Sequence, residues 1–188
     1  MTIIPLVDVP SQMLELLRTV GKTIQSIRYE RLKGQLLQGV NPEINTDREV
    51  LISRMHQLGF RGEILGALTE VDRKVLAAST PLDFKGCVGD LRTLFEEIVE
   101  DAAKRAAKLT NTTPPSGPLK SDFKPWKDLL VRTKVLTEEE ADLFQKLYNY
   151  LSNVGTHRLG SGQEHVRIAK NTVIEFGLLL VGRVQSLV

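Results

Sequence analysis

The sequence predicts an all-α protein, and three observations support this prediction. Ser or Thr followed three residues later by Glu, a pattern typical of a capped helix start, precedes several apolar runs. The pairs are Thr46 with Glu49, Thr137 with Glu140, and Ser161 with Glu164. Glycines that commonly end a helix follow amphipathic runs at Gly39, Gly59 and Gly155. No segment alternates apolar and polar residues over the length of a strand, so we expect no sheet.

The apolar spacing then places the individual helices. We expect them at about residues 11–38, 47–58, 62–78, 82–109, 123–134, 138–152 and 162–184. The helix over 82–109 begins behind a Thr80–Pro81 cap and carries the apolar stripe Val88, Leu91, Phe95, Ile98 and Ala102. On its outer face we expect two ion pairs one turn apart, Glu100 with Lys104 and Asp101 with Arg105. The stretch 111–118, rich in proline, predicts a loop.

The second half of the last helix is apolar on nearly every side. Its opposite faces carry Ile174, Leu178 and Val181 against Phe176, Leu179 and Leu180. Such a helix belongs inside a bundle or an oligomer interface. For domain organisation we expect an N-terminal helical region over residues 1–79 and a bundle of about four helices over residues 80–188.

Composition excludes several classes of protein. The 188 residues have a formal net charge of +2, from 25 basic and 23 acidic residues, which excludes a polybasic coat and an acidic tail. The single cysteine, Cys87, forms no intrachain disulfide and favours a reducing compartment, so we expect a cytoplasmic protein. The most apolar stretch, 173–184, contains Glu175 and Arg183 and is too short to cross a bilayer, so we expect no membrane partner.

Motifs for metals and nucleotides are absent from the sequence. It has no His-x-x-x-His or Cys-x-x-Cys spacing, no phosphate-binding glycine loop and no dinucleotide-binding turn. We therefore expect neither a metal site nor a cofactor, and no catalysis that depends on one.

The segment 149–165 gathers polar side chains around a helix–loop–helix corner. His165 falls in the first turn of the last helix, on the stripe that faces inward, where the positive end of the helix dipole favours a neutral imidazole. Arg158 precedes that helix, where a guanidinium and free N–H groups can hold a phosphate oxygen. These groups suit phosphodiester cleavage without a metal, the histidine acting as general base. The alternative is a core histidine beside a solvated arginine.

Three stretches of sequence resemble the HEPN superfamily, in particular the helical C-terminal domains of prokaryotic abortive-infection and antiviral proteins. They are residues 86–97, residues 147–158 and residues 164–171, and the resemblance covers roughly residues 80–188. It implies a bundle of about four helices, frequent homodimerisation and, in active members, RNA cleavage without a metal. The family motif is an arginine followed, after a polar residue and a spacer, by a histidine.

Two placements of this motif are open. Arg158 and His165 have the expected spacing, although Leu159 replaces the usual polar neighbour. Alternatively His157 is the motif histidine, in which case Ser152 stands near the place of the arginine and the phosphate-binding guanidinium is missing. The catalytic candidates are therefore Arg158, His165 and His157.

A second cluster mixes basic and aromatic residues in a way that suits single-stranded nucleic acid. Its candidate contacts are Lys124, Trp126 and Lys127, and Asn153 adds a polar side chain near the corner. The alternative is that Trp126 and Phe123 are core residues with lysines outside.

Together these observations predict an HEPN-like protein of a prokaryotic defence system. We expect a homodimer that cleaves RNA without a metal, a site shared between two subunits being one arrangement. The alternative is a catalytically inactive helical module that binds a partner protein, such as another defence component, or nucleic acid. A DNA-binding regulator is a weaker third hypothesis, because no recognition-helix pattern is evident.

Overall fold

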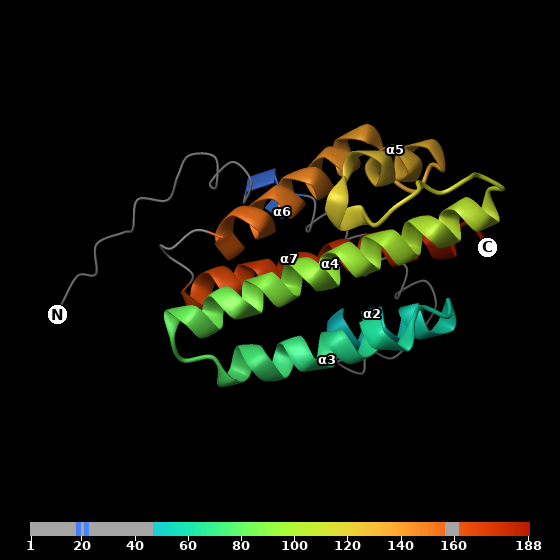
Figure 1. Ribbon diagram of the computed structural model, residues 1–188. Coiled ribbons are helices and arrows are strands. Elements are labelled where there is room, and N and C mark those ends of the chain that lie inside the picture. Colours follow the sequence, from blue (N-terminus) through green and yellow to red (C-terminus); the bar gives the residue numbers. More distant parts are fainter. Residues whose placement is uncertain (1–17, 20, 23–46, 157–161) are drawn as a thin grey trace. The chain divides into compact units, whose positions relative to one another are not determined.

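A computed structural model describes residues 18, 19, 21, 22, 47–156 and 162–188. Its elements are α2 (Asp47–Gln57), α3 (Gly62–Ala77), α4 (Pro81–Leu109), the short 3-10 helix η1 (Leu119–Ser121), α5 (Lys124–Arg132), α6 (Glu138–Thr156) and α7 (Gln163–Gln185) (Figure 1). No strand occurs among these residues, so the all-α prediction is confirmed. The helices from α2 onward begin and end within a few residues of the ranges expected from the sequence. The helix expected at 11–38 falls mostly outside the described residues.

The chain divides into two compact units, residues 1–43 and residues 44–188. The second unit holds every helix from α2 to α7. Residues 44–79 belong to it because α2 packs against α7 and α3 packs along α4, burying Leu51, Ile64 and Leu68. The structure thus divides the chain before α2, whereas the sequence suggested a division after residue 79.

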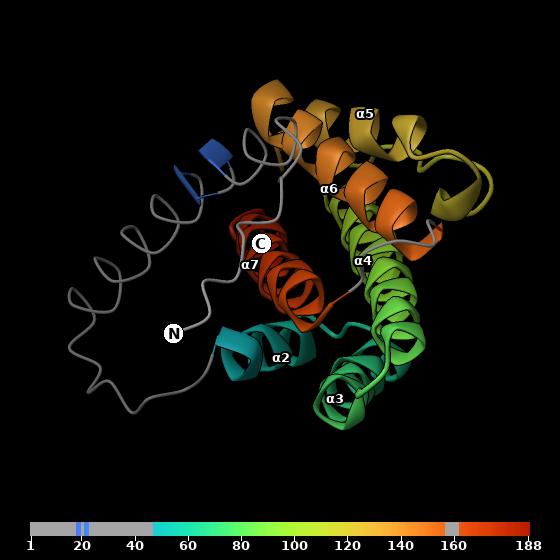
Figure 2. The same cartoon turned by 90° about the vertical axis from the view of Figure 1, so that its left-hand side faces the viewer.

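Helix α4 is the central element of the second unit. It has 29 residues and packs against α3, α5, α6 and α7, as the end-on view of Figure 2 shows. The whole predicted stripe is buried, with no residue of it more than 1% exposed: Val88, Leu91, Phe95, Ile98 and Ala102. Aromatic contacts continue this core, since the ring of Phe95 lies 5.7 Å from that of Phe144, which lies 4.7 Å from that of Phe176.

Helix α7 lies inside the bundle, as its apolar sequence predicted. It packs against both α2 and α4. Of the ten residues 172–181, all except Leu179 are buried. Small residues allow this close approach. Gly177 faces Leu51 of α2 and Ile98 of α4, and a Cβ at this position would lie 3.0 Å from a methyl of Leu51.

Two of the predicted helix starts are confirmed in detail. Thr80 and Asp83 form a reciprocal capping box at α4. At α6, the Glu140 N–H donates to the Thr137 hydroxyl and the Thr137 N–H donates to the Glu140 carboxylate. Thr46 and Ser161 lie outside the described residues, and the residue that precedes α7 as its cap is Gly162.

The predicted glycine stops have different outcomes. Gly59 ends α2 with a left-handed φ of 72°, which a residue with a Cβ adopts only with strain. Gly155 does not end α6, because the helix continues to Thr156, so this prediction was wrong. Gly39 lies outside the described residues.

Both ion pairs predicted on α4 form, but one of them is not on an outer face. Glu100 pairs with Lys104 at 2.6 Å and Asp101 pairs with Arg105 at 2.9 Å. Asp101 is only 7% exposed, because the turn between α2 and α3 covers it. Arg105 crosses to that turn and donates to the carbonyl oxygens of Leu58 and Gly59.

Glu100 gives the fold a defined pH dependence. Burial raises the pKa of this carboxyl, but hydrogen bonds from the Leu119 N–H and the Lys104 ammonium lower it more, so its pKa lies below the ordinary value. A carboxyl whose pKa is lower when folded stabilises the fold above its unfolded pKa and loses this contribution as the pH falls through the folded pKa. We expect Glu100→Gln to lower the free energy of unfolding by about 1 kcal/mol at neutral pH and by almost nothing in strong acid. Urea titrations at the two pH values measure this, and an equal loss at both would contradict it.

Candidate functional site

His165, one of the three predicted catalytic residues, lies at the end of the bundle where α6 stops and α7 starts. Helix α4 also begins at this end, and α4 and α7 run side by side from it (Figure 1). His165 lies in the first turn of α7, as predicted, and its backbone N–H donates to the Gly162 carbonyl at 3.0 Å. His157 and Arg158 lie outside the described residues. Both placements of the motif therefore stay predictions.

The side chain of His165 is half-buried. It starts the inward stripe predicted for α7, whose next members Ala169, Thr172 and Phe176 are buried. A half-buried imidazole at a helix start is accessible to solvent on one side and packed on the other. This position suits a general acid or base, and it also suits a residue that only helps to close the end of the core.

The cations in the first two turns of α7 are engaged with acids. Arg167 lies 3.4 Å from the carboxylate of Glu164 on an exposed surface. Lys170 pairs with Asp72 of α3, which also pairs with Arg48 of α2 at 2.6 Å. The two pairs of Asp72 link α3 with α2 and α7, whereas the pair of Arg167 lies on an exposed surface within α7.

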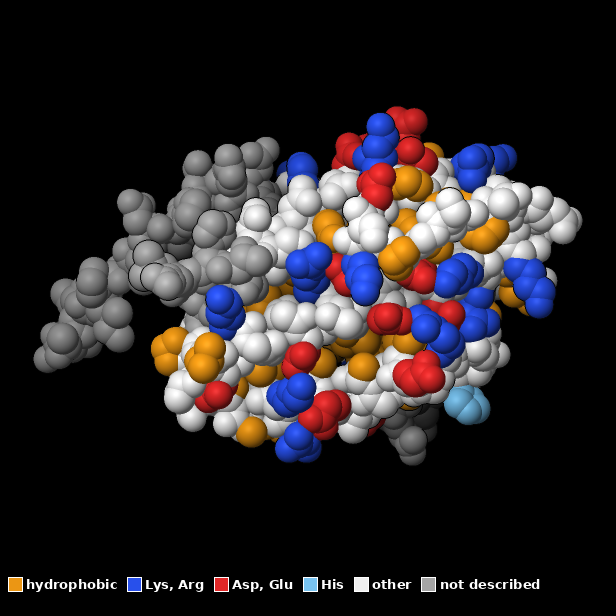
Figure 3. Space-filling view, viewed as in Figure 1, with side chains coloured by type: hydrophobic (Ala, Val, Ile, Leu, Met, Phe, Trp, Pro, Cys, Tyr) orange, Lys and Arg blue, Asp and Glu red, His pale blue; other side chains and the backbone are white. Residues whose placement is uncertain are grey.

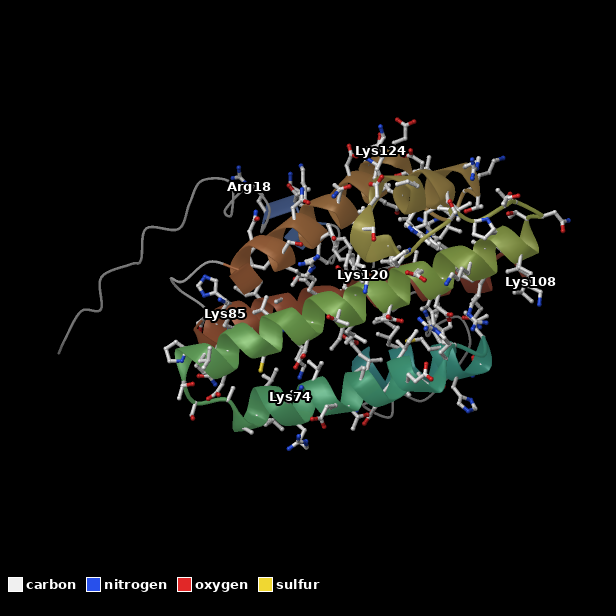
Figure 4. The ribbon with its side chains drawn as sticks, in the orientation of Figure 1. Arg18, Lys74, Lys85, Lys108, Lys120 and Lys124 are labelled. Atoms are coloured by element: carbon white, nitrogen blue, oxygen red, sulfur yellow. The ribbon has the colours of Figure 1, made fainter. Side chains whose placement is uncertain are left out.

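The basic and aromatic cluster does not present its aromatic rings to a ligand. Trp126 is 2% exposed and Phe123 is 4% exposed, which favours the alternative that both are core residues. Lys127 pairs with Asp142 at 2.7 Å, whereas Lys124 is exposed. Figure 4 shows Lys120 and Lys124 beside η1 and α5, on the other side of α4 from Lys74 of α3. The exposed Asn153 lies near the carboxyl end of α6 and so, as predicted, near the corner.

The structure contains a feature that the sequence did not reveal, a groove between α3 and α4. It consists of two adjoining hollows of about 320 and 350 Å³, and both are lined by Lys74 and Asp90. Figure 3 shows this hollowed strip with apolar side chains at its base and charged side chains along its edges. Leu76 and Leu82, near the turn between α3 and α4, are 87% and 77% exposed, but neither lines a hollow, and no sequence pattern indicated the groove.

Ionised side chains face one another across the groove. Lys74 of α3 pairs with Asp90 of α4 at 2.8 Å, and this hydrogen bond raises the pKa of the lysine. Cys87 lies at the base of one hollow, and burial raises the pKa of its thiol. A raised pKa keeps the thiol protonated and unreactive near neutral pH, so Cys87 is a packing residue here.

Comparison of the chain with known proteins identified no relative. No protein-family model, no curated protein and no solved structure matches the chain. None of the described helices combines the length and hydropathy needed to cross a bilayer. In the same part of the chain, no three His, Cys, Asp or Glu side chains are grouped as a metal site requires.

Proposed function

We propose that the chain is an HEPN-like protein of a prokaryotic defence system, a cytoplasmic homodimer that cleaves RNA at the α6–α7 end without a metal. The observation that supports this proposal is the half-buried His165 in the first turn of α7, at the end where α6 stops and α4 begins. The six residues between the end of α6 and the start of α7 include His157 and Arg158. The chain therefore has two imidazoles and one guanidinium within nine residues.

In the proposed reaction one histidine takes the proton from a ribose 2′-hydroxyl. The 2′-oxygen then attacks the adjacent phosphorus, the bond from phosphorus to the 5′-oxygen breaks, and the leaving oxygen takes up a proton. Arg158 stabilises the negative charge that develops on the phosphoryl oxygens. The products are a 2′,3′-cyclic phosphate and a free 5′-hydroxyl, and no metal or cofactor takes part.

Cleavage of end-labelled single-stranded RNA in the presence of a chelator tests the proposal. We expect the native protein to cut the RNA and Arg158→Ala to lose at least about 100-fold in rate, the scale of one catalytic group. His157→Ala and His165→Ala identify the motif histidine, because the replacement at that position lowers the rate to a similar extent. His56→Ala is the matched control, since His56 lies exposed on α2, and we expect it to leave the rate unchanged.

Two outcomes would contradict the proposal. Native protein that leaves RNA intact would favour the inactive binding module. Cleavage that survives all three replacements in the segment 157–165 would show that these residues do not carry the activity. Retained folding of each variant, measured by circular dichroism, ensures that a lost rate reflects lost chemistry.

A further inference from the structure

Positive charge is concentrated in one part of the chain, from the second half of α4 to just beyond α5. Residues 104–134 contain eight basic and two acidic residues, a net charge of +6, whereas the whole chain has +2. The other residues therefore carry a net charge of −4. The eight basic residues are Lys104, Arg105, Lys108, Lys120, Lys124, Lys127, Arg132 and Lys134.

Contacts around Glu100 bring three elements of this part together. The Glu100 carboxylate accepts hydrogen bonds from the Lys104 ammonium at 2.6 Å and from the Leu119 N–H of η1 at 3.0 Å. The same ammonium lies over the ring of Trp126 in α5, 5.7 Å from its centroid. The second half of α4, η1 and the start of α5 therefore adjoin.

Four lysines of these elements form what we call the basic surface: Lys104, Lys108, Lys120 and Lys124. Lys108 follows Lys104 by one turn of α4, Lys120 belongs to η1, and Lys124 is the first residue of α5. Figure 4 shows Lys108 at the far end of α4 and Lys120 and Lys124 beside η1 and α5. Figure 3 shows Lys and Arg side chains gathered over the second half of α4.

Three of these four cations are available to a ligand. Lys108, Lys120 and Lys124 are exposed, and none of them forms an ion pair with a residue that the structure describes. By contrast, Lys74 of α3 and Lys170 of α7 both pair with acids. Stabilisation of the helices does not explain all three, because a cation in the first turn of a helix, where Lys124 stands, is unfavourable. Helix α5 has no acid in that turn, whereas α2, α3, α4, α6 and α7 each have at least one.

The surroundings of the basic surface indicate which anion fits it. Trp126 is buried, so its ring cannot stack on a base. Leu109, beside Lys108, is 43% exposed, and a single leucine is too little apolar surface to anchor the protein in a bilayer. The hollow between α5 and α6 has three acids in its lining, so a polyanion is favoured on the α4 side of α5: Asp128, Glu138 and Asp142. Lysines without accessible aromatic rings suit the phosphates of a nucleic acid.

We propose that the basic surface binds the phosphate backbone of RNA, without base stacking and away from the proposed cleavage site. The choice of RNA rests on the proposed function. Glu100, beside this surface, is 19 residues after Pro81, which corresponds to about 28 Å along α4 from the end that carries His165. A dinucleotide cannot reach from one place to the other, whereas a long RNA can contact both. The surface therefore selects long RNA as the substrate class.

Binding of 2′-O-methyl RNA to the full chain tests the inference by fluorescence anisotropy. This RNA has the phosphates but no free 2′-hydroxyl, so the proposed reaction cannot cut it, and binding is measured whether or not the protein is a ribonuclease. We expect a Kd on the order of 10 μM in about 50 mM salt, and affinities within about threefold for single-stranded and duplex forms. Failure to cleave ordinary RNA would contradict only the proposed function.

Charge-reversal variants locate the binding site. We expect Lys108→Glu and Lys120→Glu each to weaken binding at least about threefold and to reduce the salt dependence of log Kd by about one ion. Arg73→Glu is the matched control, because it makes the same change of charge at an exposed residue of α3, and it is expected to leave the Kd unchanged. Circular dichroism shows that each variant is folded.

Four results would overturn the inference. They are no binding of the RNA, equal weakening by Arg73→Glu and Lys120→Glu, single-stranded RNA that binds more than about tenfold tighter than duplex, and displacement of the RNA by vesicles of anionic phospholipid. The third result would indicate base stacking, and the fourth would indicate that the surface binds a membrane.

Discussion

Gly177→Leu is expected to lower the free energy of unfolding by more than about 3 kcal/mol, because the centre of the bundle has no space for a side chain at this position. A Cβ placed on Gly177 would lie 3.0 Å from one methyl of Leu51 and 3.4 Å from the other, with Ile98 at 3.8 Å. Leu51 and Ile98 are both completely buried. The Cβ and the three further heavy atoms of a leucine side chain must therefore push α7 away from α2 and α4. A typical domain has a free energy of unfolding of about 5–15 kcal/mol. We therefore expect much of the variant protein to be unfolded or loosely packed.

Two alanine variants separate this crowding from the intrinsic cost of glycine in a helix. Gly89→Ala in α4 meets no atom within 4 Å and is expected to stabilise the protein by about 0.5–1 kcal/mol, the helix propensity difference. Gly177→Ala gains the same propensity but must displace Leu51 by a few tenths of an ångström, so we expect it to remain within about 1 kcal/mol of the native protein. Urea unfolding followed by circular dichroism measures all three variants. A leucine variant as stable as the alanine variant would show that the contact between α2 and α7 is not close.

The sequence was sufficient to predict the helices because their signals are local. Caps such as Thr80 with Asp83 and the stripe from Val88 to Ala102 depend on residues one turn apart, and the structure confirms both. The positions of α2 and α3 in the fold depend instead on contacts between residues that are far apart in sequence. Leu51 meets Gly177 across more than a hundred residues, and no periodicity within 47–58 indicates that partner. The division suggested after residue 79 differs from the structure for this reason.

The charged residues of α4 show a related limit of prediction from sequence. Asp101 and Arg105 have the spacing of a solvent-exposed ion pair, and the pair forms, yet the aspartate is buried beneath the turn that follows α2. The groove was missed in the same way, because Glu63 and Glu97 are distant in sequence and have no pattern between them. For the predicted site, spacing placed His165 correctly at the start of α7. Whether its imidazole shares a cleft with Arg158 depends on three-dimensional placement, which spacing does not determine.

Arg105→Met is expected to lower the free energy of unfolding by about 2–4 kcal/mol, a loss comparable to that expected for Gly177→Leu. The guanidinium holds the buried carboxylate of Asp101 at 2.9 Å and the Leu58 carbonyl oxygen at 2.6 Å, and it also binds the Gly59 carbonyl. It lies over the ring of Phe60, 4.6 Å from its centroid. Methionine keeps much of the aliphatic stem but leaves a buried carboxylate and two carbonyl oxygens of the α2–α3 turn without these donors. Asp101 then retains an ion pair with Arg61 of the turn at 3.5 Å.

The loss is expected to concentrate at the α2–α3 turn, because Arg105 of α4 donates to the Leu58 and Gly59 carbonyl oxygens of that turn. Hydrogen exchange of the amides of α2 and α3 should therefore speed up more than that of α6. Arg105→Lys keeps the charge but not the planar fork of donors, so we expect it to recover less than half of the lost stability. Arg73→Met, at an exposed pair with Glu70, is the matched control and is expected to leave the unfolding midpoint unchanged. Equal effects at Arg105 and Arg73 would mean that the bonds of Arg105 to the turn contribute nothing beyond a surface ion pair.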